Sequence, residues 1–538
     1  MAYSPAVVTP ASDRAPGGWL GRLLRRRRPL PDLEARIACF REVLCANNTA
    51  LGLLTRIQQA LAGEAAVPAP ELRRLVTGVV VSTYRMILHL NRMTGDRFPG
   101  LAQRFDQLRT RITQKVEVTP FLGSLPPVVP LAKVTAAMAE EVGQKSAFLG
   151  EAQRLLPGRV PEGFATTAAA YREFMTAGGL GDRIAELMAG LDPSQLAACF
   201  TVANRISQMV ESAPLPPSLK SALERAAGAA TRPGERLAVR SSALQEGGLA
   251  VSFAGQYRSL LNVGPEGVQD AFRQVVASKY SPQAIVYRLN RGFEDAEVAM
   301  CCCVLRMVDA AAAGVLYSAC QTEDGVRTLL QAVRGLGLSA VDGSAEPDSY
   351  LLDRRQRRVV SHKLGRQLAA LHCGTGEGTE RLAVPAGVKG LPVLAPSQAV
   401  EVAALACRLE DHLGQPVDME WAIDGSGRAW VLQVRPQPEH AEKADRPRTP
   451  RIEGAPVLLA GGTRASGGAG CGPLHRVETD LDLLRFPAGA VLLTSEANPR
   501  LAVLLPKAAA LLADLGETTG HLATVARELR VPALLATR

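Results

Sequence analysis

Residues 417–437, VDMEWAIDGSGRAWVLQVRPQ, constrain the fold more than any other segment of this chain. Apolar and polar residues alternate on both sides of DGSG, a run of turn-forming residues. This is the pattern of two antiparallel strands that bury one face. With a four-residue loop, Ile423 pairs with Arg428 and Asp418 lies opposite Gln433. The segment therefore predicts a β-hairpin with a defined register.

The two faces of this predicted hairpin differ in chemistry. By the two-residue period of a strand, one face carries two carboxylates, an amide and a guanidinium. These belong to Asp418, Glu420, Gln433 and Arg435. The other face is apolar and is expected to point into a core: Met419, Trp421, Leu432 and Val434. Carboxylate and amide oxygens suit Mg²⁺ held together with phosphate groups. The alternative interpretation is a solvent-exposed ion pair across the strands.

A second constellation lies at Leu237–Val263, LAVRSSALQEGGLAVSFAGQYRSLLNV. A predicted strand, LAVRSS, contains Arg240 and leads into a loop rich in Gly and Ser. Small residues let backbone N–H groups approach phosphate oxygens, and an Arg side chain can bind the same anion with two hydrogen bonds. The loop therefore indicates an anion site, although many glycine-rich loops are only turns.

Two single residues also stand where they could meet a phosphate group. Lys145 follows a Gly and precedes small residues, so it could reach a nucleotide phosphate, although an isolated Lys is usually a solvated surface residue. His521 follows GETTG and begins HLATVAREL, which has helical periodicity. Its predicted place at a helix start, beside unpaired N–H groups, suits a His that carries a phosphoryl group. The alternative for His521 is an ordinary polar residue near a helix start.

Composition limits the class of protein. The chain has 538 residues, 47% of them hydrophobic, and a net charge of +9, part of which lies in RLLRRRR at Arg22–Arg28. We interpret that run as a solvated, disordered leader rather than an arm for nucleic acid or a membrane surface. The ten Cys form no CxxC pair, and Cys301–Cys303 lie in an apolar run, which predicts a buried strand and a reducing, cytoplasmic compartment. No apolar run reaches the length of a membrane span.

Periodicity and proline-rich breaks divide the chain into segments. Residues 33–63, 71–95 and 97–116 carry apolar residues at steps of three and four, which predicts a small helical bundle. After the break at Pro120–Pro130, strands and helices alternate. The expected divisions are a disordered basic leader at 1–30, a helical domain at 31–125, a mixed α/β domain at 126–438, a linker at 439–455 and a Gly-rich β/α segment at 456–538.

These segments, in this order, resemble the phosphoenolpyruvate synthase and pyruvate phosphate dikinase family. VGQKSAFLGE, VPEGFATTAAAYREFM, VRSSALQEGGLAVSFAGQY, AGVLYSA, RGLGLSAVDGSAEPDSYLLDR and DMEWAIDGSGRAWVLQVRP are similar to its ATP-grasp nucleotide-binding domain. DLGETTGHLATVARELRVPALL is similar to its swivelling phosphohistidine domain. The resemblance implies a multidomain protein of α+β and α/β class. It would contain an ATP-grasp domain at 126–438 and an incomplete swivelling domain at 456–538, with the helical bundle as an addition.

The resemblance also implies site roles, with ATP and Mg²⁺ as the cofactors. His521 would take a phosphoryl group from ATP, which in the dikinases is the β-phosphoryl group, with AMP as a product. Lys145 and Arg240 would act at the ATP phosphates. The loop over the phosphates would be Ser252, Phe253, Ala254, Gly255 and Gln256; the other nucleotide contacts would be Met307, Val308 and Arg435; the metal residues would be Glu420, Gln433 and Asp418. The sequence departs from the family at Leu305 and Leu338, where Gln and Glu are usual.

The expected function is an ATP-dependent kinase or phosphotransferase with paired acceptors, similar to a pyruvate, water dikinase. The family's TIM barrel for pyruvate and phosphoenolpyruvate does not follow residue 538, so we expect a truncated product or an acceptor site on a partner chain. One alternative is transfer to another small molecule, as in the rifampin phosphotransferases. Another is a non-catalytic, nucleotide-binding interaction protein. We expect no nucleic-acid or membrane partner, and a homodimer stays open.

Overall fold

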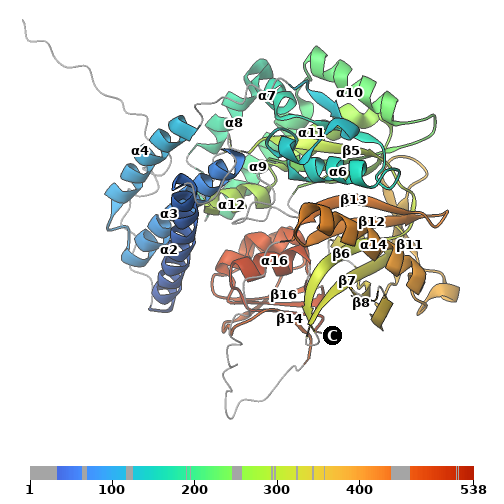
Figure 1. The fold of residues 1–538 in the computed structure, drawn as a ribbon. Helices are drawn as coiled ribbons and strands as arrows, with labels where there is room; N and C mark the ends of the chain where they lie inside the picture. Colours follow the sequence, from blue (N-terminus) through green and yellow to red (C-terminus); the bar gives the residue numbers. More distant parts are fainter. Residues whose placement is uncertain are drawn as a thin grey trace, which may run out of the picture. The chain divides into compact units, whose positions relative to one another are not determined.

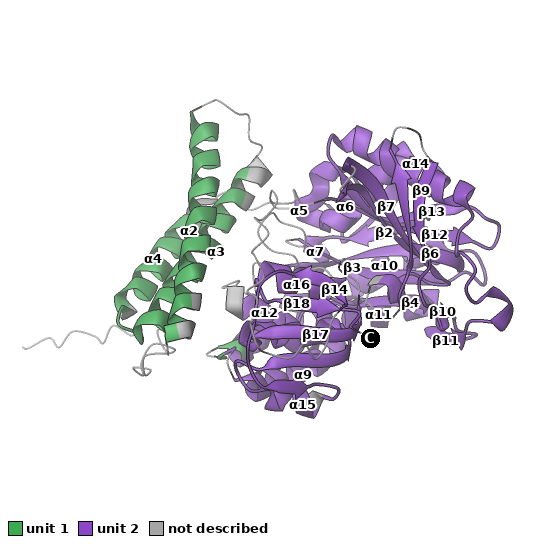
Figure 2. Cartoon of the chain, turned by 90° about the horizontal axis from the view of Figure 1, so that it is seen from below, with its two compact units in different colours: residues 1–121, 188–192 green, residues 122–187, 193–538 purple. Residues whose placement is uncertain are grey.

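The structure is a computed structural model of the 538-residue chain. It describes residues 33–62, 69–116, 125–189, 191–193, 195–244, 257–291, 295, 298–322, 325–341, 345–354, 356, 358–437, 461–516, 518 and 520–537. The predicted leader at 1–30 and the predicted linker at 439–455 lie outside these residues. Two compact units form, residues 1–121 with 188–192 and residues 122–187 with 193–538 (Figure 2).

The first unit contains three helices within the segment that was expected to be helical. Its helices are α2 (Leu33–Leu61), α3 (Ala69–Thr94) and α4 (Pro99–Val116). Each has apolar residues at helical spacing, which supplies the stripe that buries against a neighbouring helix. The α3–α4 contact is centred on Tyr84 and Phe105, whose ring centroids lie 6.0 Å apart. The unit is thus a helical bundle with its own small core.

The second unit, whose described elements run from cyan to red in Figure 1, begins with an antiparallel five-stranded sheet in the order β1-β2-β5-β3-β4. The strands are β1 (Val128–Pro130), β2 (Gly163–Thr166), β3 (Leu237–Ala243), β4 (Ser259–Val263) and β5 (Met300–Arg306). Its helices are α5 (Ala139–Val142), α6 (Gln144–Leu155), α7 (Ala168–Thr176), α8 (Leu180–Met188), α9 (Leu196–Ser212), α10 (Pro217–Ala230), α11 (Val268–Ser278) and α12 (Pro282–Arg291). The predicted burial of Cys301–Cys303 in a strand is confirmed, because all three are at most 3% exposed in β5.

A second antiparallel sheet of six strands follows, in the order β13-β12-β6-β7-β8-β9. The strands are β6 (Ala310–Thr322), β7 (Gly325–Arg334), β8 (Asp348–Asp353), β9 (Arg358–Lys363), β12 (Val417–Asp424) and β13 (Ala429–Pro436). The other elements here are α13 (Leu338–Val341), α14 (Pro396–Leu413) and a separate hairpin of β10 (Ala369–Cys373) and β11 (Thr379–Ala383). The main core lies between this sheet, α14 and α6, and it includes Trp421 and Met419.

The last segment forms a five-stranded sheet in the order β14-β18-β17-β16-β15. The strands are β14 (Thr463–Ser466), β15 (Leu474–Arg476), β16 (Val491–Glu496), β17 (Ala510–Leu515) and β18 (Ala533–Leu535), with α15 (Asp480–Arg485) and α16 (His521–Glu528). Strands β15 to β18 pair in parallel, and β14 is antiparallel to β18. In the part of the chain that the structure describes, no helix has the length and apolar character needed to cross a membrane.

Candidate functional site

The predicted hairpin at 417–437 forms as β12 and β13, but with a different register. Glu420 lies opposite Gln433, Asp418 lies opposite Arg435, and Ile423 pairs with Ala429. The predicted pairs Ile423–Arg428 and Asp418–Gln433 are therefore wrong. Two local features explain the difference, a shift of one residue at the turn and a β-bulge.

The turn is held by the carboxylate of Asp424. This side chain accepts hydrogen bonds from the backbone N–H groups of Ser426, at 2.9 Å, and Arg428, at 3.1 Å, and from the indole Nε1 of Trp430, at 2.7 Å. Such side-chain bonds to nearby backbone groups stabilise a turn. The backbone N–H of Asp424 also donates to the carbonyl of Arg428 at 3.1 Å, so Asp424 lies opposite Arg428 and Ile423 lies opposite Ala429, a shift of one residue from the prediction.

The bulge is at Leu432, the extra residue between the pairs Trp421–Val431 and Glu420–Gln433. A bulge turns side chains beyond it to the other face of the strand. Val431 therefore packs in the main core, while Leu432 packs against a different apolar group, contrary to the prediction that Leu432 points into the main core. Met419, Trp421 and Val434 are buried in the main core, as predicted. The shift of one residue at the turn and the extra residue at the bulge add up to two residues. Gln433 and Arg435 therefore keep the face that was predicted for them.

The polar face carries a connected set of hydrogen bonds. Nε2 of Gln433 donates to Oε1 of Glu420 at 3.0 Å, and Nε of Arg435 donates to Oδ2 of Asp418 at 2.6 Å. The guanidinium of Arg240, from β3, pairs with Oε2 of Glu420. Asp418 is 6% exposed and Gln433 is 8% exposed, so the alternative of a solvent-exposed ion pair is excluded. Charges held in a buried cluster of this kind are typical of functional sites.

Lys145 reaches this region because the start of α6 docks on β3. Gly143 has φ +79°, and a Cβ there would lie 2.1 Å from the carbonyl oxygen of Ser242, so only glycine fits. The backbone N–H of Ser146 donates to Oγ of Ser242 at 3.1 Å, and that hydroxyl donates to the carbonyl of Val142 at 2.8 Å. Since Ser242 stands two residues after Arg240, the dock brings the first turn of α6 beside the guanidinium.

The protonation of the two carboxylates follows from this arrangement. Burial favours the neutral form of Glu420, but the positive charges of Arg240, Lys145 and Arg435 outweigh burial and lower the pKa of Glu420. Burial raises the pKa of Asp418 above its ordinary value, and Arg435 opposes that rise only in part, while the charge of Glu420 adds to it. Glu420 is thus the carboxylate that stays ionised most readily.

An apolar group adjoins the polar face; we call it the second apolar cluster. Its residues come from four separate stretches of chain and from the β12–β13 hairpin: Leu261, Met307, Val308, Ala310, Ala313, Leu336, Leu371, Cys373, Ala422 and Leu432. Leu432 joins the two regions, because its side chain lies in the cluster while its carbonyl accepts a hydrogen bond from Nη1 of Arg240 at 3.2 Å. Met307 and Val308 were expected to contact a nucleotide. Leu261, Leu336, Leu371 and Cys373 were missed, because no local pattern marks them.

Other predicted positions have varied outcomes. The loop residues Ser252–Gln256 lie outside the described residues. Leu305 is 2% exposed within the main core, and Leu338 is 39% exposed at the start of α13. Of these two positions at which the sequence departs from the family, Leu305 is thus buried and Leu338 is exposed.

Helix α16 begins at His521, as the sequence predicted, although the side chain of His521 is outside the described part. The turn before it depends on Gly516, which has φ +154° and where a Cβ would lie 2.6 Å from Cβ of Ala497. Arg527 ties the turn to the helix, because its Nη1 donates to the carbonyl of Thr518 at 2.6 Å. His521 therefore occupies a helix start whose approach is fixed by glycine geometry and an Arg side chain.

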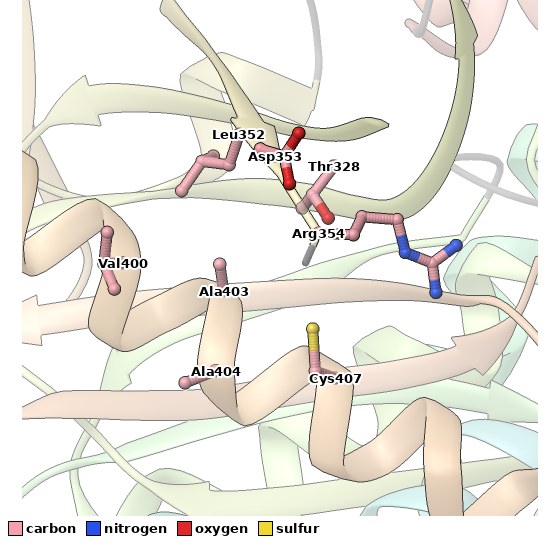
Figure 3. A pocket seen from close by; sticks show the side chains of 8 residues that line it. All are labelled: Thr328, Leu352, Asp353, Arg354, Val400, Ala403, Ala404 and Cys407. Atoms are coloured by element: carbon pink, nitrogen blue, oxygen red, sulfur yellow. The ribbon is translucent and has the colours of Figure 1, made fainter. Parts of the chain in front are cut away.

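A small recess on the six-stranded sheet is separate from these residues (Figure 3). It lies between α14, with Val400, Ala403 and Cys407, and the β7–β8 strands, with Thr328 and Leu352. Its volume of about 10 Å³ holds about one water molecule. It shares no residue with the polar face and is too small for a nucleotide.

The polar face has the right chemistry for a hard divalent cation. No group of three or more His, Cys, Asp or Glu side chains in the described ranges is arranged to hold a metal by itself. Glu420 and the side-chain amide of Gln433 instead offer two neighbouring oxygen-bearing groups, which fits Mg²⁺ because that ion takes few protein ligands and fills the rest from phosphates and water. Asp418 is engaged by Arg435 at 2.5 Å and supports the face.

Comparisons with known proteins place the chain in a family. Residues 139–453 match the AMP/ATP-binding domain of pyruvate phosphate dikinase, and residues 486–538 match the mobile domain of PEP-utilising enzymes. The chain is 32% identical over 423 residues to a phosphoenolpyruvate synthase of Neisseria meningitidis, covering 74% of this chain and 53% of that protein. A Pseudomonas aeruginosa phosphoenolpyruvate synthase is 33% identical over 431 residues, 76% of this chain and 54% of that protein.

A rifampicin phosphotransferase from a Streptomyces species is 37% identical over 313 residues, which is 57% of this chain and 36% of that protein. The chain thus spans about half the length of the phosphoenolpyruvate synthases that it matches. The AMP/ATP-binding domain alone covers more than half of the chain. This protein therefore belongs to the pyruvate phosphate dikinase and phosphoenolpyruvate synthase family, whose AMP/ATP-binding and mobile domains it carries.

Proposed function

We propose that this chain is an ATP-dependent phosphotransferase of the dikinase type that phosphorylates its own His521. The group would then pass to pyruvate, at a barrel on a longer form of the chain or on a partner, as the names of the phosphoenolpyruvate synthase relatives suggest. The observation that carries the proposal is the partly buried set of Arg240, Glu420, Gln433 and Lys145 beside an apolar cluster.

The polar face is the proposed phosphate end. Arg240 and Lys145 supply positive charge on one side, and Glu420 with Gln433 supplies oxygen ligands on the other. Phosphoryl transfer needs little covalent help from a protein, and its rate depends mainly on positioning and charge stabilisation. When bound there, Mg²⁺ would neutralise charge on the phosphate oxygens. Arg240 would hold the phosphate chain, and Asp418 with Arg435 would keep the face in place.

The second apolar cluster is the proposed base end. Met307 and Val308 lie between β5 and β6, where the chain passes from the five-stranded to the six-stranded sheet. An aromatic base gains free energy from burial against apolar side chains, while few polar groups fix its orientation. The cluster adjoins Arg240 through Leu432, so one nucleotide could reach both ends.

His521 is the proposed acceptor of the phosphoryl group. A ring nitrogen would attack the β-phosphorus, the bond from that phosphorus to the oxygen of AMP would break, and AMP would leave. The histidine would then carry both remaining phosphoryl groups; water would attack the γ-phosphorus, the bond between the γ-phosphorus and the bridging oxygen would break, and inorganic phosphate would leave the β-phosphoryl group on the ring. The start of α16 favours negative charge, since the backbone N–H groups of a first helical turn have no partners within the helix.

The proposal predicts covalent labelling. The purified chain is incubated with Mg²⁺ and ATP labelled at the β-phosphorus, and the protein is tested for label that is acid-labile and base-stable. We expect labelling of the parent and none of His521→Ala. The variant should still bind ATP with nearly unchanged affinity, because His521 lies outside the two proposed ends.

The position of the label separates this reaction from an ordinary kinase reaction. ATP labelled at the γ-phosphorus should leave no stable label and should release labelled phosphate. Equal labelling of His521→Ala and the parent would remove His521 from the mechanism. Binding of ATP without any labelling would favour the non-catalytic nucleotide-binding alternative.

The second candidate is transfer to a different small molecule. The Streptomyces rifampicin phosphotransferase is 37% identical over its aligned region, whereas the two phosphoenolpyruvate synthases above are 32% and 33% identical over theirs. Labelled chain would be mixed separately with pyruvate and with rifampicin, each at saturating concentration. Loss of label to pyruvate supports the first candidate, and loss to rifampicin supports the second.

A further inference from the structure

Asn262, in β4, has an unusual backbone conformation. Its φ is +59°, in the left-handed region that side chains other than glycine rarely adopt, although Asn tolerates it better than most. Leu237 pairs with Val263 and Val239 pairs with Leu260, so β4 has one extra residue at this point. Asn262 is therefore part of a β-bulge, and such bulges often re-aim a side chain.

The re-aimed side chain binds the turn of the β10–β11 hairpin. Nδ2 of Asn262 lies within hydrogen-bond distance of three carbonyl oxygens, those of Gly374 at 3.0 Å, Gly376 at 2.7 Å and Gly378 at 2.8 Å. The backbone N–H of Gly378 donates back to the carbonyl of Asn262 at 3.2 Å. We call this set the Asn262 clamp. Asn262 is 4% exposed, so its donors are committed to this turn.

A second contact reinforces the clamp from the hairpin side. Oε1 of Glu377 accepts a hydrogen bond from the backbone N–H of Gly264 at 2.8 Å and lies 3.9 Å from Nη1 of Arg236. The carbonyl of Arg236 in turn accepts a hydrogen bond from the N–H of Met307 at 2.8 Å. The turn is thereby connected to the chain that carries Met307 into the second apolar cluster.

The hairpin depends on such ties for its position. Strands β10 and β11 form a separate two-stranded sheet, and two strands alone are only marginally stable in water. At its other side, the N–H of Leu336 donates to the carbonyl of Leu371 at 2.7 Å, which joins the hairpin to the end of β7. The Asn262 clamp joins it to the five-stranded sheet. The hairpin thus bridges the two sheets.

The hairpin also supplies part of the second apolar cluster. Leu371 and Cys373, from β10, lie there with Leu261, the residue before Asn262. Loss of the Asn262 side chain would leave the ties to Leu336 and Gly264 intact but would remove the side-chain hydrogen bonds that hold the β10–β11 turn on β4. The Arg240 and Glu420 contacts are on β3 and β12 and would be unaffected.

We infer that Asn262 is a positioning residue for the nucleotide base: through the clamp it fixes β10 as one wall of the second apolar cluster. This inference rests on the proposed function. Asn262 acts through the hairpin and does not need to touch the nucleotide. Its loss should weaken binding of ATP, which has a base, and spare binding of a ligand that has only phosphates.

The test uses ATP and inorganic tripolyphosphate as paired probes, each with Mg²⁺. Asn262→Gly keeps the left-handed backbone but removes the side-chain donor. We expect the dissociation constant for ATP to rise about 10-fold. This is the rise expected if β10 kept its position in the second apolar cluster for about a tenth of the time. The dissociation constant for tripolyphosphate should stay within about two-fold of the parent value, because the phosphate end is untouched. Asn498→Gly, at a cap in the last segment, is the matched control and should change neither constant.

The outcomes separate a positioning role from a structural one. Equal loss of both probes would mean general damage and would overturn the inference, as would an unchanged dissociation constant for ATP. If the parent bound neither probe, the proposed function would fail first. Asn262→Asp, which also tolerates a positive φ but places an acceptor against three carbonyls, should give the same split between probes.

Hydrogen exchange in the parent gives an answer without any variant: ATP should protect residues 369–383, tripolyphosphate should not, and equal protection by both would contradict the inference.

Discussion

The two ends of the proposed nucleotide site are built in different ways. The polar end is concentrated on one hairpin, where Asp418, Glu420, Gln433 and Arg435 share a face, and only Arg240 and Lys145 come from elsewhere. The apolar end is gathered from four stretches of chain and the β12–β13 hairpin, which are far apart in sequence. At the polar end, the register of the hairpin decides which four of the groups meet. At the apolar end, position depends on loops and on long-range ties such as the Asn262 clamp.

The largest expected effect is at the polar end. Glu420→Gln removes the carboxylate that pairs with Arg240 and that we assign to the metal, but it keeps the shape of the side chain. Covalent labelling by ATP should slow by about 100-fold, the usual scale for losing one group that stabilises charge in the transition state. The measurement is the initial rate of labelling at saturating ATP and Mg²⁺.

The control for this variant is the next residue, on the opposite face. The indole Nε1 of Trp421 is buried, with no hydrogen-bond partner among the described residues, so Trp421→Phe removes a donor that has no acceptor. The folded variant should label within about two-fold of the parent, because Trp421 points into the main core and away from the polar face, while the smaller ring lowers the melting temperature. Parental labelling by Glu420→Gln, or a large loss in Trp421→Phe, would contradict the assignment of the two faces.

A smaller effect is expected at the apolar end. Leu432→Ala removes a side chain from the second apolar cluster but keeps the carbonyl that binds Arg240. KM for ATP should rise about 10-fold with kcat nearly unchanged, because an apolar contact to the base is the same in the ground and transition states. Val431→Ala, one residue away in the main core, should instead lower the melting temperature and leave KM alone. The reverse pattern would mean that the cluster does not face the nucleotide.

The smallest expected effect is a shift with pH. The pKa of Asp418 is raised above 3.8 by burial, so this carboxylate gains a proton at a higher pH than an ordinary aspartate does. Between 3.8 and the raised pKa the folded state binds the proton better, so the contribution of Asp418 to the free energy of unfolding falls as pH rises. Labelling should fall as pH drops through the raised pKa, because the polar face then loses a negative charge.

Arg435→Met should move that acid limb to higher pH, because the positive charge that opposes the rise in the pKa of Asp418 is gone. The measurement is kcat/KM for ATP against pH in both proteins. Arg327→Met breaks a different ion pair of the same sheet, with Asp353, and should leave the profile in place. An unmoved limb in Arg435→Met would show that Asp418 does not set it.

The sequence predicted the polar end of the proposed site better than the apolar end. Alternation over 417–437 is a local signal, and it correctly assigned Asp418, Glu420, Gln433 and Arg435 to one face. The predicted register was wrong because an alternating sequence pattern reveals neither the bulge at Leu432 nor the side-chain hydrogen bonds of Asp424. Helix starts are also local, which is why α16 begins at His521 as predicted.

The apolar end was largely beyond sequence reasoning. Leu371 and Cys373 are ordinary strand residues, and only the fold brings them to Leu261 and Met307. Neither helical nor strand periodicity marks Asn262 in the sequence. Its role depends on a positive φ inside a strand, which periodicity does not reveal. The placement of Met307 and Val308 was expected only through the family resemblance. Contacts between distant loops depend on tertiary packing, and propensity does not encode them.

The bulge at Leu432 has a consequence for how the length of this hairpin can vary. The Asp424–Gly427 turn is mostly exposed, so an added residue there would extend a solvent loop and leave both strands as they are. One residue added between Trp430 and Gln433 would instead reverse every side chain beyond it, turning Val434 toward Arg240 and Arg435 into the main core. An insertion in the turn would therefore leave the site intact, whereas an insertion a few residues later, in the strand, would destroy it.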